Sequence, residues 1–346
     1  MAATMKEVAE QAGVSLITVS RVVNGVGYVR ADTRARVLAA VAALEYIPNQ
    51  GASSLRSRQT RTLALLLPTI ANSFWTTIAR GVEDEGEARG YSVFLCNTDD
   101  DPVKEARYLD VLLRRRVEGV VIVPTVASTG QLRRAQQRGM PVVQLHRKLD
   151  DLDADIVRSD SYGGAATLTE QLLATGRRRI AFIGGALAVS TARERLAGYE
   201  ATLRTAGIAP DRALAKIGSA TPESGYTLMG ELLARKPHPE AVVIGNSRLA
   251  LGALRALRDA GLAVPEDLAV AAFHDIVALD ADSPNLITAT QPAYDIGRLG
   301  TRRLLDRLVG LADPPVDLIL PNHIKLPPVA GIDKPLRTTE VARNLA

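Results

Sequence analysis

The sequence has little of what a disulfide framework, a metal cluster or a membrane span requires. Cys96 is the only cysteine among 346 residues, so no intramolecular disulfide can form and no cysteine-based metal site is expected. No apolar run reaches the roughly 20 residues that cross a bilayer. The first residues, MAATMKEVAEQAG, include acidic side chains where a secretory signal would have a basic end and an apolar run. We therefore expect a cytoplasmic protein with no membrane partner, no metal and no cofactor.

Aromatic residues are also scarce, at 4% of the chain, so the core must consist mainly of aliphatic side chains. The length exceeds what one hydrophobic core usually supports, which predicts two or more domains. Charge is unevenly placed. Residues 1–60 hold seven basic and four acidic side chains and so carry +3 of the total net charge of +4. A compact basic end on a nearly neutral remainder is typical of a protein that binds a polyanion, although a solvated basic face would look the same.

The first 46 residues have the pattern of a three-helix unit. Thr4 and Glu7 form a capping-box pattern, Gly13 permits a tight turn, and Ser15 can cap a second helix that buries Val19 and Val22. A third helix is expected over residues 31–44, with buried side chains at Val37, Leu38, Val41 and Leu44. The first two helices have the pattern of a DNA-binding helix-turn-helix, whose second helix enters the major groove; a purely structural hairpin would follow the same rules.

After a linker at residues 47–61, short apolar runs alternate with amphipathic stretches. The runs are LALLLP, YSVFLCN, GVVIVP, PVVQL, RRIAFIGG, AVVIGN and LAVAAF. Continuous apolar strands separated by helices predict parallel sheets covered on both faces, and renewed alternation after a long gap predicts two similar lobes.

The segments MKEVAEQAGVSLITVSRVVN, TRARVLAAVAALEYIPNQGASSL, RLAGY and GNSRLALGAL together resemble the lac-repressor (LacI/GalR) family of bacterial transcription regulators. The resemblance covers essentially the whole chain. It implies a small all-α helix-turn-helix head and an α/β body of two doubly wound lobes, like a type I periplasmic binding protein. It also implies a homodimer that binds a pseudo-palindromic double-stranded DNA operator and responds to a small molecule between the lobes. The tail lacks leucine heptads, so we expect a dimer and no tetramer-forming coiled coil.

The implied domains are a head at residues 1–46, a hinge at 47–61 and a body at 62–346. Within the body, the N-lobe takes residues 62–160 and 292–322, and the C-lobe takes residues 161–291 and 323–335. The hinge contains Gly51, Ser53 and Ser54, which are weak helix formers, so we expect it to fold only on DNA.

The resemblance also implies the DNA-contacting residues. Three read bases in the major groove: Leu16, Ile17 and Arg21. Arginine can pair bidentately with guanine, whereas an apolar side chain meets a thymine methyl group. Four position the phosphates: Ser15, Thr18, Ser20 and Asn24. Ala52 and Leu55 match the hinge positions that enter the minor groove at the operator centre.

By the same resemblance, seven residues contact the effector: Phe74, His146, Arg147, Thr191, Arg195, Asn246 and His274. Sugar-binding members typically have aspartate where this chain has His146, Ser247 and His274. The cleft has thus lost carboxylate acceptors and kept cations, which predicts an anionic sugar derivative. Protonated imidazoles would strengthen such binding as the pH falls through about 6.5. A neutral sugar or a nucleobase is the alternative effector.

The expected function is a ligand-responsive repressor of a carbohydrate-metabolism operon, acting at the nucleoid. An α/β enzyme is a distant alternative, because the sequence has no phosphate-binding loop, dinucleotide fingerprint or nucleophile elbow. A solute-binding transport protein would share the body fold, but it would not have the helical head.

Overall fold

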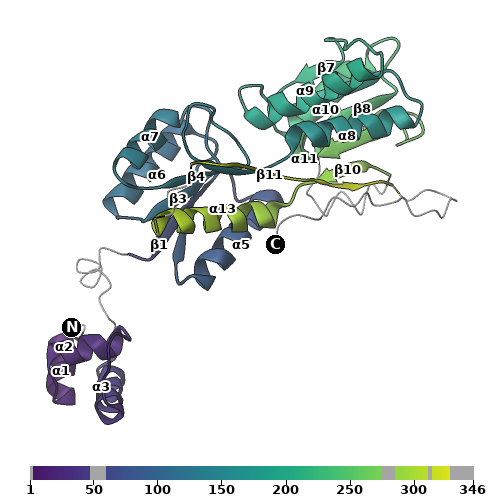
Figure 1. The fold of residues 1–346 in the computed structure, drawn as a ribbon. Coiled ribbons are helices and arrows are strands. Elements are labelled where there is room, and N and C mark those ends of the chain that lie inside the picture. The colour runs from purple at the N-terminus through teal and green to yellow at the C-terminus, as the bar shows by residue number, and fades with distance from the viewer. Residues whose placement is uncertain (1–2, 47–59, 274–284, 311–313, 328–346) are drawn as a thin grey trace, which may run out of the picture. The chain divides into compact units, whose positions relative to one another are not determined.

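The computed structural model describes residues 3–46, 60–273, 285–310 and 314–327 (Figure 1). The chain divides into two compact units, at residues 1–60 and 61–346. The predicted hinge contacts Ala52 and Leu55, and the predicted effector contact His274, lie outside the described residues.

The head consists of three helices, α1 (Met5–Ala12), α2 (Leu16–Val23) and α3 (Ala31–Ala43). The predicted capping box is present, because the Thr4 hydroxyl accepts from the Glu7 amide and the Glu7 carboxylate accepts from the Thr4 amide. Gly13 ends α1 in the left-handed region, at a φ of 63°. Buried Val8, Val19 and Val37 join the helices into one core.

The prediction for the buried face of α3 was partly wrong. Val37 is buried, but Leu38 is 51% exposed, and the other inward position is taken by Ala40. Val41 and Leu44 pack against the core only at its edge. The predicted burial of Leu38 was therefore wrong, because the helix orients that side chain outward.

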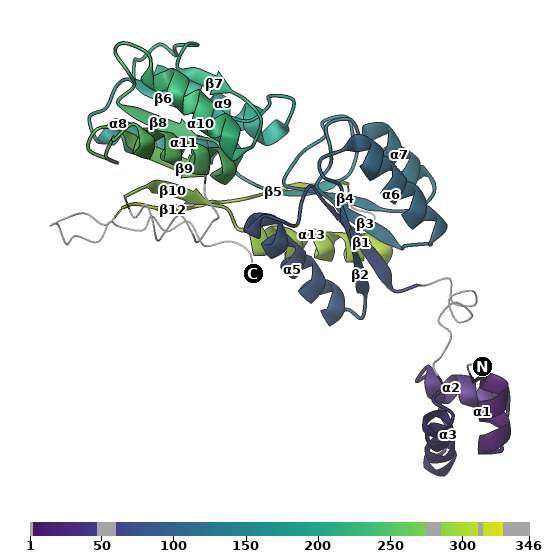
Figure 2. The ribbon, with the colours of Figure 1, turned by 180° about the vertical axis from the view of Figure 1, so that it is seen from behind.

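The body contains two six-stranded sheets, and most neighbouring strands are parallel (Figures 1 and 2). The first sheet has the order β11-β5-β4-β3-β1-β2. Its strands are β1 (Thr62–Leu67), β2 (Ser92–Asn97), β3 (Gly119–Ile122), β4 (Val142–Leu145), β5 (Asp155–Ser159) and β11 (Asp317–Leu320). The second sheet has the order β12-β10-β9-β8-β6-β7. Its strands are β6 (Ile180–Gly184), β7 (Ala215–Ile217), β8 (Ala241–Ile244), β9 (Ala269–Phe273), β10 (Ile287–Thr290) and β12 (His323–Lys325).

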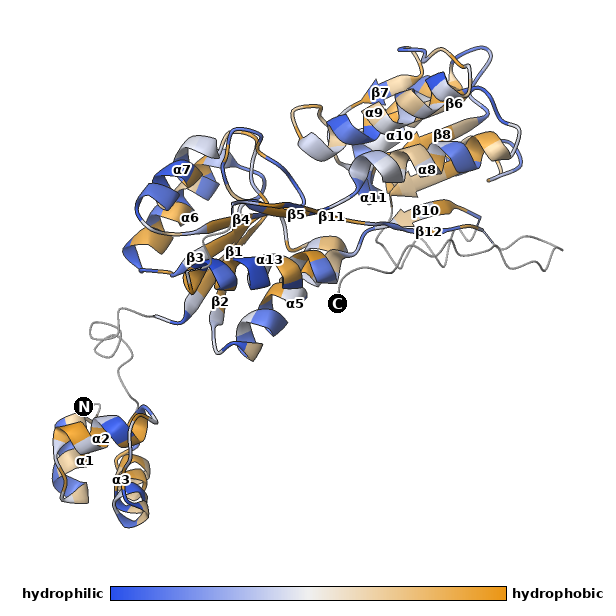
Figure 3. Ribbon diagram, viewed as in Figure 1, coloured by the Kyte–Doolittle hydropathy of each residue, from blue (hydrophilic) through white to orange (hydrophobic). Residues whose placement is uncertain are grey.

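Each sheet has helices on both faces, so each is a three-layer lobe. In the N-lobe, α5 (Ser73–Ala88) and α13 (Ala293–Leu308) cover one face, and α6 (Pro102–Arg114) and α7 (Thr129–Gln137) cover the other. In the C-lobe, α10 (Pro222–Leu233) and α11 (Ser247–Asp259) cover one face, and α8 (Ser161–Ala174) and α9 (Ser190–Thr205) cover the other. The apolar strands lie between the helices in Figure 3, and polar positions lie on the outer helix faces. The predicted fold class is confirmed.

All seven apolar runs form strands, but the predicted set was incomplete. The five additional strands are β5, β7, β10, β11 and β12. They are short or carry polar side chains: β5 has the sequence DIVRS, and β11 and β12 end their sheets. In the described part of the chain, no helix is long and apolar enough to cross a bilayer.

Candidate DNA-binding surface and effector cleft

Helix α2 has opposite surfaces of clearly different character. Val19 and Val22 are buried in the head, whereas Leu16 is 49% exposed and Ile17 is 67% exposed at the first turn. Neither of these large aliphatic side chains belongs to the buried core of the head. Because the first turn of a recognition helix meets base edges, this exposure suits the predicted base-reading role.

The side chains predicted to contact phosphates form hydrogen bonds at both ends of α2. The Ser15 hydroxyl caps the helix by accepting from the Thr18 amide, and it lies 3.0 Å from the Thr18 hydroxyl. At the other end, the Asn24 side-chain amide donates to the Ser20 carbonyl at 2.8 Å and to the Ser20 hydroxyl at 3.1 Å. These polar groups are therefore held in fixed positions, as phosphate-positioning groups would need to be.

Beyond α2 the head exposes apolar and aromatic side chains that the sequence reasoning missed. Tyr28 is 88% exposed and Val26 is 64% exposed, in the loop that joins α2 to α3. Arg21 is exposed, and its side chain passes close to Gly27 of this loop. The signal was available in the sequence GVGYV, where a tyrosine stands between glycine and valine without a helical or strand partner.

We expect Arg21→Ala to weaken binding to the operator by about 1–3 kcal/mol and to relax one base position in each half-site. The cause is the loss of a bidentate contact to one base. Binding to base-substituted operators measures both effects. Lys6→Ala is the matched control, because Lys6 is a 77% exposed cation of α1 in an i,i+4 pair with Glu10. Equal loss of affinity on every sequence for Arg21→Ala would contradict a base-reading role.

In the body, His146 lies immediately after β4 in a strained backbone conformation. Its φ is 61°, in the left-handed region that residues other than glycine adopt rarely, and its amide donates to the Val157 carbonyl at 2.8 Å. The imidazole is 6% exposed, lies 4.9 Å from the Phe74 ring and 5.2 Å from the Trp75 ring, and its Nδ1 has no hydrogen-bond partner. Such strain and an unpaired buried nitrogen are typical of a functional site.

The electrostatic surroundings of His146 correct one expectation. Burial and, after it, the positive charges of Arg195, Arg147 and Arg158 hold the pKa of His146 well below its usual value. The imidazole is therefore neutral at neutral pH, and the expected change in its charge near pH 6.5 was wrong. A neutral imidazole offers one donor and one acceptor to a ligand.

Arg147 has an acidic partner that the sequence reasoning missed. Its guanidinium forms a two-point ion pair with Asp100, at 2.5 and 3.1 Å, and lies 5.9 Å from the Trp75 ring centre. Asp100 follows β2 and Arg147 follows β4, two strands that are separated in the sheet by β3 and β1. Only the folded sheet brings the loops after these strands together. A carboxylate therefore lies beside the cleft even though His146, Ser247 and His274 stand where sugar-binding members typically have aspartate.

Arg195 connects the predicted contacts of the C-lobe. This buried side chain donates to the Gly245 carbonyl and, at 2.9 Å, to the Gln291 side-chain oxygen. Its guanidinium stacks 3.8 Å from the Phe273 ring centre. Gly245 precedes Asn246, whose side chain caps α11, and Phe273 precedes the predicted contact at 274. The structure thus brings α9, the start of α11 and the end of β9 together.

Thr191 is buried in the first turn of α9, and a small pocket opens beside that turn. The pocket has a volume of about 170 Å³ and is lined by segments 124–129 and 147–151 of the N-lobe and 188–193 of the C-lobe. Both lobes therefore contribute to it. Among the described residues, no cluster of histidine, cysteine and carboxylate side chains could hold a metal ion.

A head with an exposed recognition helix and a two-lobed α/β body with a polar cleft define a ligand-sensing DNA-binding protein. Two family models match the chain: "Bacterial regulatory proteins, lacI family" over residues 4–49, and "Periplasmic binding proteins and sugar binding domain of LacI family" over residues 60–306. The chain belongs to the LacI family. It is a DNA-binding transcription regulator and not an enzyme, as the sequence predicted.

Named relatives and solved structures agree with this membership. The chain is 36% identical to the HTH-type transcriptional regulator RegA of Clostridium saccharobutylicum, over 89% of this chain and 93% of RegA. It is also 36% identical to the ribose operon repressor of Escherichia coli K12, over 88% and 93% of the two chains. A lac repressor dimer bound to operator and the anti-inducer ONPF matches with a TM-score of 0.84 and 28% identity, over 94% and 98% of the chains. The regulator CelR in complex with cellobiose matches with a TM-score of 0.71 and 33% identity, over the same shares.

Proposed function

We propose that this regulator is a homodimeric repressor of a carbohydrate-metabolism operon, acting on the nucleoid in the cytoplasm. Each head reads half of a pseudo-palindromic operator, the hinge at residues 47–61 contacts the minor groove through Ala52 and Leu55, and an effector between the lobes changes operator affinity. The observation that carries the proposal is the exposure of Leu16 and Ile17 on a helix whose other face is buried in the head.

Two exposed apolar surfaces on the body support a dimer. Phe94 is 52% exposed and Leu95 is 46% exposed on β2, the edge strand of its sheet. On the C-lobe, Tyr226 of α10 is 40% exposed and Leu251 of α11 is 37% exposed. An unpaired edge strand with apolar side chains on both faces favours pairing with another chain.

The experiment is the selection of binding sites from random double-stranded DNA with the purified full chain. A dimer of this kind selects an inverted repeat with two similar half-sites, because operator symmetry mirrors protein symmetry. Selection of a single half-site, or recovery of no consensus sequence, would contradict the proposal.

For the effector we propose an anionic sugar derivative. The support is the group of three guanidiniums, Arg147, Arg158 and Arg195, whose charge reaches His146 in the cleft. A neutral sugar is the second candidate. It is favoured by the aromatic cluster of Phe74, Trp75 and His146, and by the pairing of Arg147 with Asp100. The Escherichia coli K12 relative is named a ribose operon repressor, and the CelR structure contains cellobiose.

The variant Asp100→Asn separates the two candidates. Removing this carboxylate frees the Arg147 guanidinium from its ion pair and abolishes the repulsion between Asp100 and an anionic effector. We therefore expect the affinity for the anionic effector to rise about tenfold and the affinity for a neutral sugar to change little. Calorimetry of neutral sugars and of their acid and phosphate derivatives measures both. The control is Asp110→Asn, at an exposed position of α6. Tight binding of a neutral sugar with no binding of any anion would contradict the anionic proposal.

A further inference from the structure

A charged network connects the two lobes beside the cleft. Arg158 of β5 forms a fork with Asp317 of β11, with Nε to Oδ1 at 2.7 Å and Nη2 to Oδ2 at 3.1 Å. Its remaining nitrogen, Nη1, donates to both carboxylate oxygens of Glu194 of α9, each at 2.9 Å. The Arg158 side chain is only 12% exposed. One guanidinium thus holds a carboxylate of its own lobe and a carboxylate of the other lobe.

Two further contacts cross between the lobes next to this network. The Lys148 amide donates to the Ser190 hydroxyl at 2.9 Å, and Arg193 pairs with Asp150 at 3.1 Å. The Lys148 ammonium also pairs with Asp317 at 3.2 Å. The Arg193–Asp150 pair is largely exposed and therefore weak. Of these two ion pairs, Arg158–Glu194 is the more buried.

The charges show why the pair matters for closure. Glu194 lies between Arg193 and Arg195 on α9, and it is the anion that this turn presents to Arg158. Without Glu194, the arginines of α9 would approach Arg158 and Lys148, and Asp317 would have to balance both of these cations. Without Arg158, Glu194 would lose its cation and would face Asp317, which would still pair with Lys148. Each single loss makes close approach of the lobes less favourable, because it leaves an excess of one charge at a partly buried surface.

We propose that the Arg158–Glu194 pair sets the closure of the two lobes, so that both are positioning residues for the neighbouring effector contact Arg195. The pair neutralises the two surfaces that meet at the cleft. Opening the lobes separates Nη1 of Arg158 from Glu194 but leaves the fork to Asp317 within the N-lobe. Closure can therefore change without unfolding either lobe. The positioning of Arg195 for an effector rests on the proposed function, whereas the role of the pair in lobe closure does not.

The titration of Glu194 supplies a signature of the pair. Burial raises the pKa of Glu194; Arg158 and Arg195 oppose the rise, and Asp317 and Asp160 reinforce it. If Arg158 is replaced by methionine, the opposing charge is lost and the pKa rises further. A raised pKa means that the closed form is favoured at low pH and loses that advantage as the pH rises through the pKa. The lobes of Arg158→Met should therefore close again in acid.

The test measures the distance between spin labels on introduced cysteines at Gln137 of α7 and Arg212, in the full chain without effector. Both positions are exposed, whereas Cys96 is buried and burial raises the pKa of its thiol to about 11, which makes it a poor target for labelling. We expect Arg158→Met and Glu194→Leu each to reduce the ratio of closed to open forms about tenfold. The double variant should restore that ratio to within about twofold, since an apolar pair replaces the ion pair and Lys148 still neutralises Asp317.

Three controls keep the result specific. Glu200→Leu removes an arginine-paired carboxylate of similar exposure from the same helix, within one lobe, and should leave the distances unchanged. Arg158→Lys retains the positive charge and should remain mostly closed. Its label-to-label distance tests the proposal even if Arg158→Met folds poorly. Lowering the pH from about 8 to about 5 should close Arg158→Met but not Glu194→Leu.

Unchanged distances in both single variants, or a double variant as open as the singles, would overturn the proposal. These results are independent of DNA and effector. If the distances behave as expected but no sugar or sugar acid binds, the proposed function fails while the pair's role in closure stands.

Discussion

Asp155→Ala should lower the free energy of unfolding of the body by about 3–5 kcal/mol. Asp155 starts β5 and is 1% exposed. Its carboxylate accepts from Arg307 at 2.7 Å, from Arg303 at 3.0 Å and from the Val316 amide at 3.0 Å. One side chain therefore attaches α13 and the strand β11 to the centre of the N-lobe. Its removal leaves two arginines together without the carboxylate that joins them.

The pH dependence has a definite sign. Burial alone would raise the pKa of Asp155, but hydrogen bonds from Arg307, Val316 and Arg303 outweigh burial and hold the pKa below its usual value. The ionised carboxylate therefore contributes stability above the pKa of the unfolded chain, and this contribution is lost as the pH falls through the lower, folded value. Urea unfolding across this acidic range should show a steeper loss for the natural chain than for Asp155→Ala.

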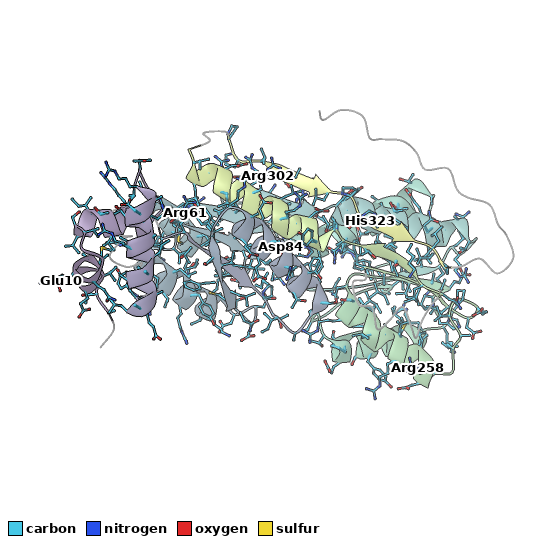
Figure 4. The ribbon with its side chains drawn as sticks, turned by 90° about the horizontal axis from the view of Figure 1, so that it is seen from below. Glu10, Arg61, Asp84, Arg258, Arg302 and His323 are labelled. Atoms are coloured by element: carbon cyan, nitrogen blue, oxygen red, sulfur yellow. The ribbon has the colours of Figure 1, made fainter. Side chains whose placement is uncertain are left out.

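The control is Asp84→Ala on α5, labelled in Figure 4. Asp84 also pairs with an arginine, Arg80 of the same helix, and it accepts a hydrogen bond of 3.1 Å from the Tyr294 hydroxyl of α13. The Arg80 side chain, however, is 68% exposed. Its loss should cost less than about 1 kcal/mol. Similar losses for Asp84→Ala and Asp155→Ala would show that the buried network is not what holds α13 and β11.

Gly252→Ala should destabilise the C-lobe by about 3 kcal/mol, near the upper end for an overpacked core. Gly252 lies where α11 crosses α10, and a Cβ atom there would come within 1.7 Å of the Pro222 carbonyl oxygen and 2.6 Å of the Tyr226 amide. Backbone atoms cannot move aside as a flexible side chain can, so the two helices must separate. The midpoint of urea unfolding measures the loss.

Gly230→Ala on α10 is the matched control, because no atom lies within 4 Å of the position that its Cβ would take. That change should stabilise the lobe by about 0.5–1 kcal/mol, since alanine is the better helix former. A stabilising effect of Gly252→Ala would contradict the close helix crossing.

The head could be predicted closely from the sequence because its signals are local. A capping box, a turn glycine and a helix cap each depend on residues within four positions, and Thr4, Gly13 and Ser15 all act as predicted. Leu38 shows the limit. Its helical spacing allowed burial, but the packing of α3 on its neighbours, which sequence spacing does not reveal, left it exposed.

The cleft could be predicted only in part because its geometry is non-local. Family resemblance pointed to His146, Arg147 and Arg195, but not to the side chains that hold the arginines. Asp100 and Gln291 come from other strand ends and approach only when the sheets form. The neutral state of His146 depends on burial and surrounding arginines, which no local pattern shows. The same holds for the Arg158–Glu194 pair between lobes.

We propose that α2 reads DNA through its exposed first turn and Arg21. The most direct measurement compares the affinities of the full chain for the selected operator and for random DNA, in the natural protein and in a variant with Leu16→Ala, Ile17→Ala and Arg21→Ala. All three side chains are exposed, so the head should remain folded. We predict at least a thousandfold preference for the operator in the natural protein, nearly all of it lost in the variant, which keeps a salt-dependent affinity for random DNA. An equal preference for the operator in both proteins would contradict base reading by α2.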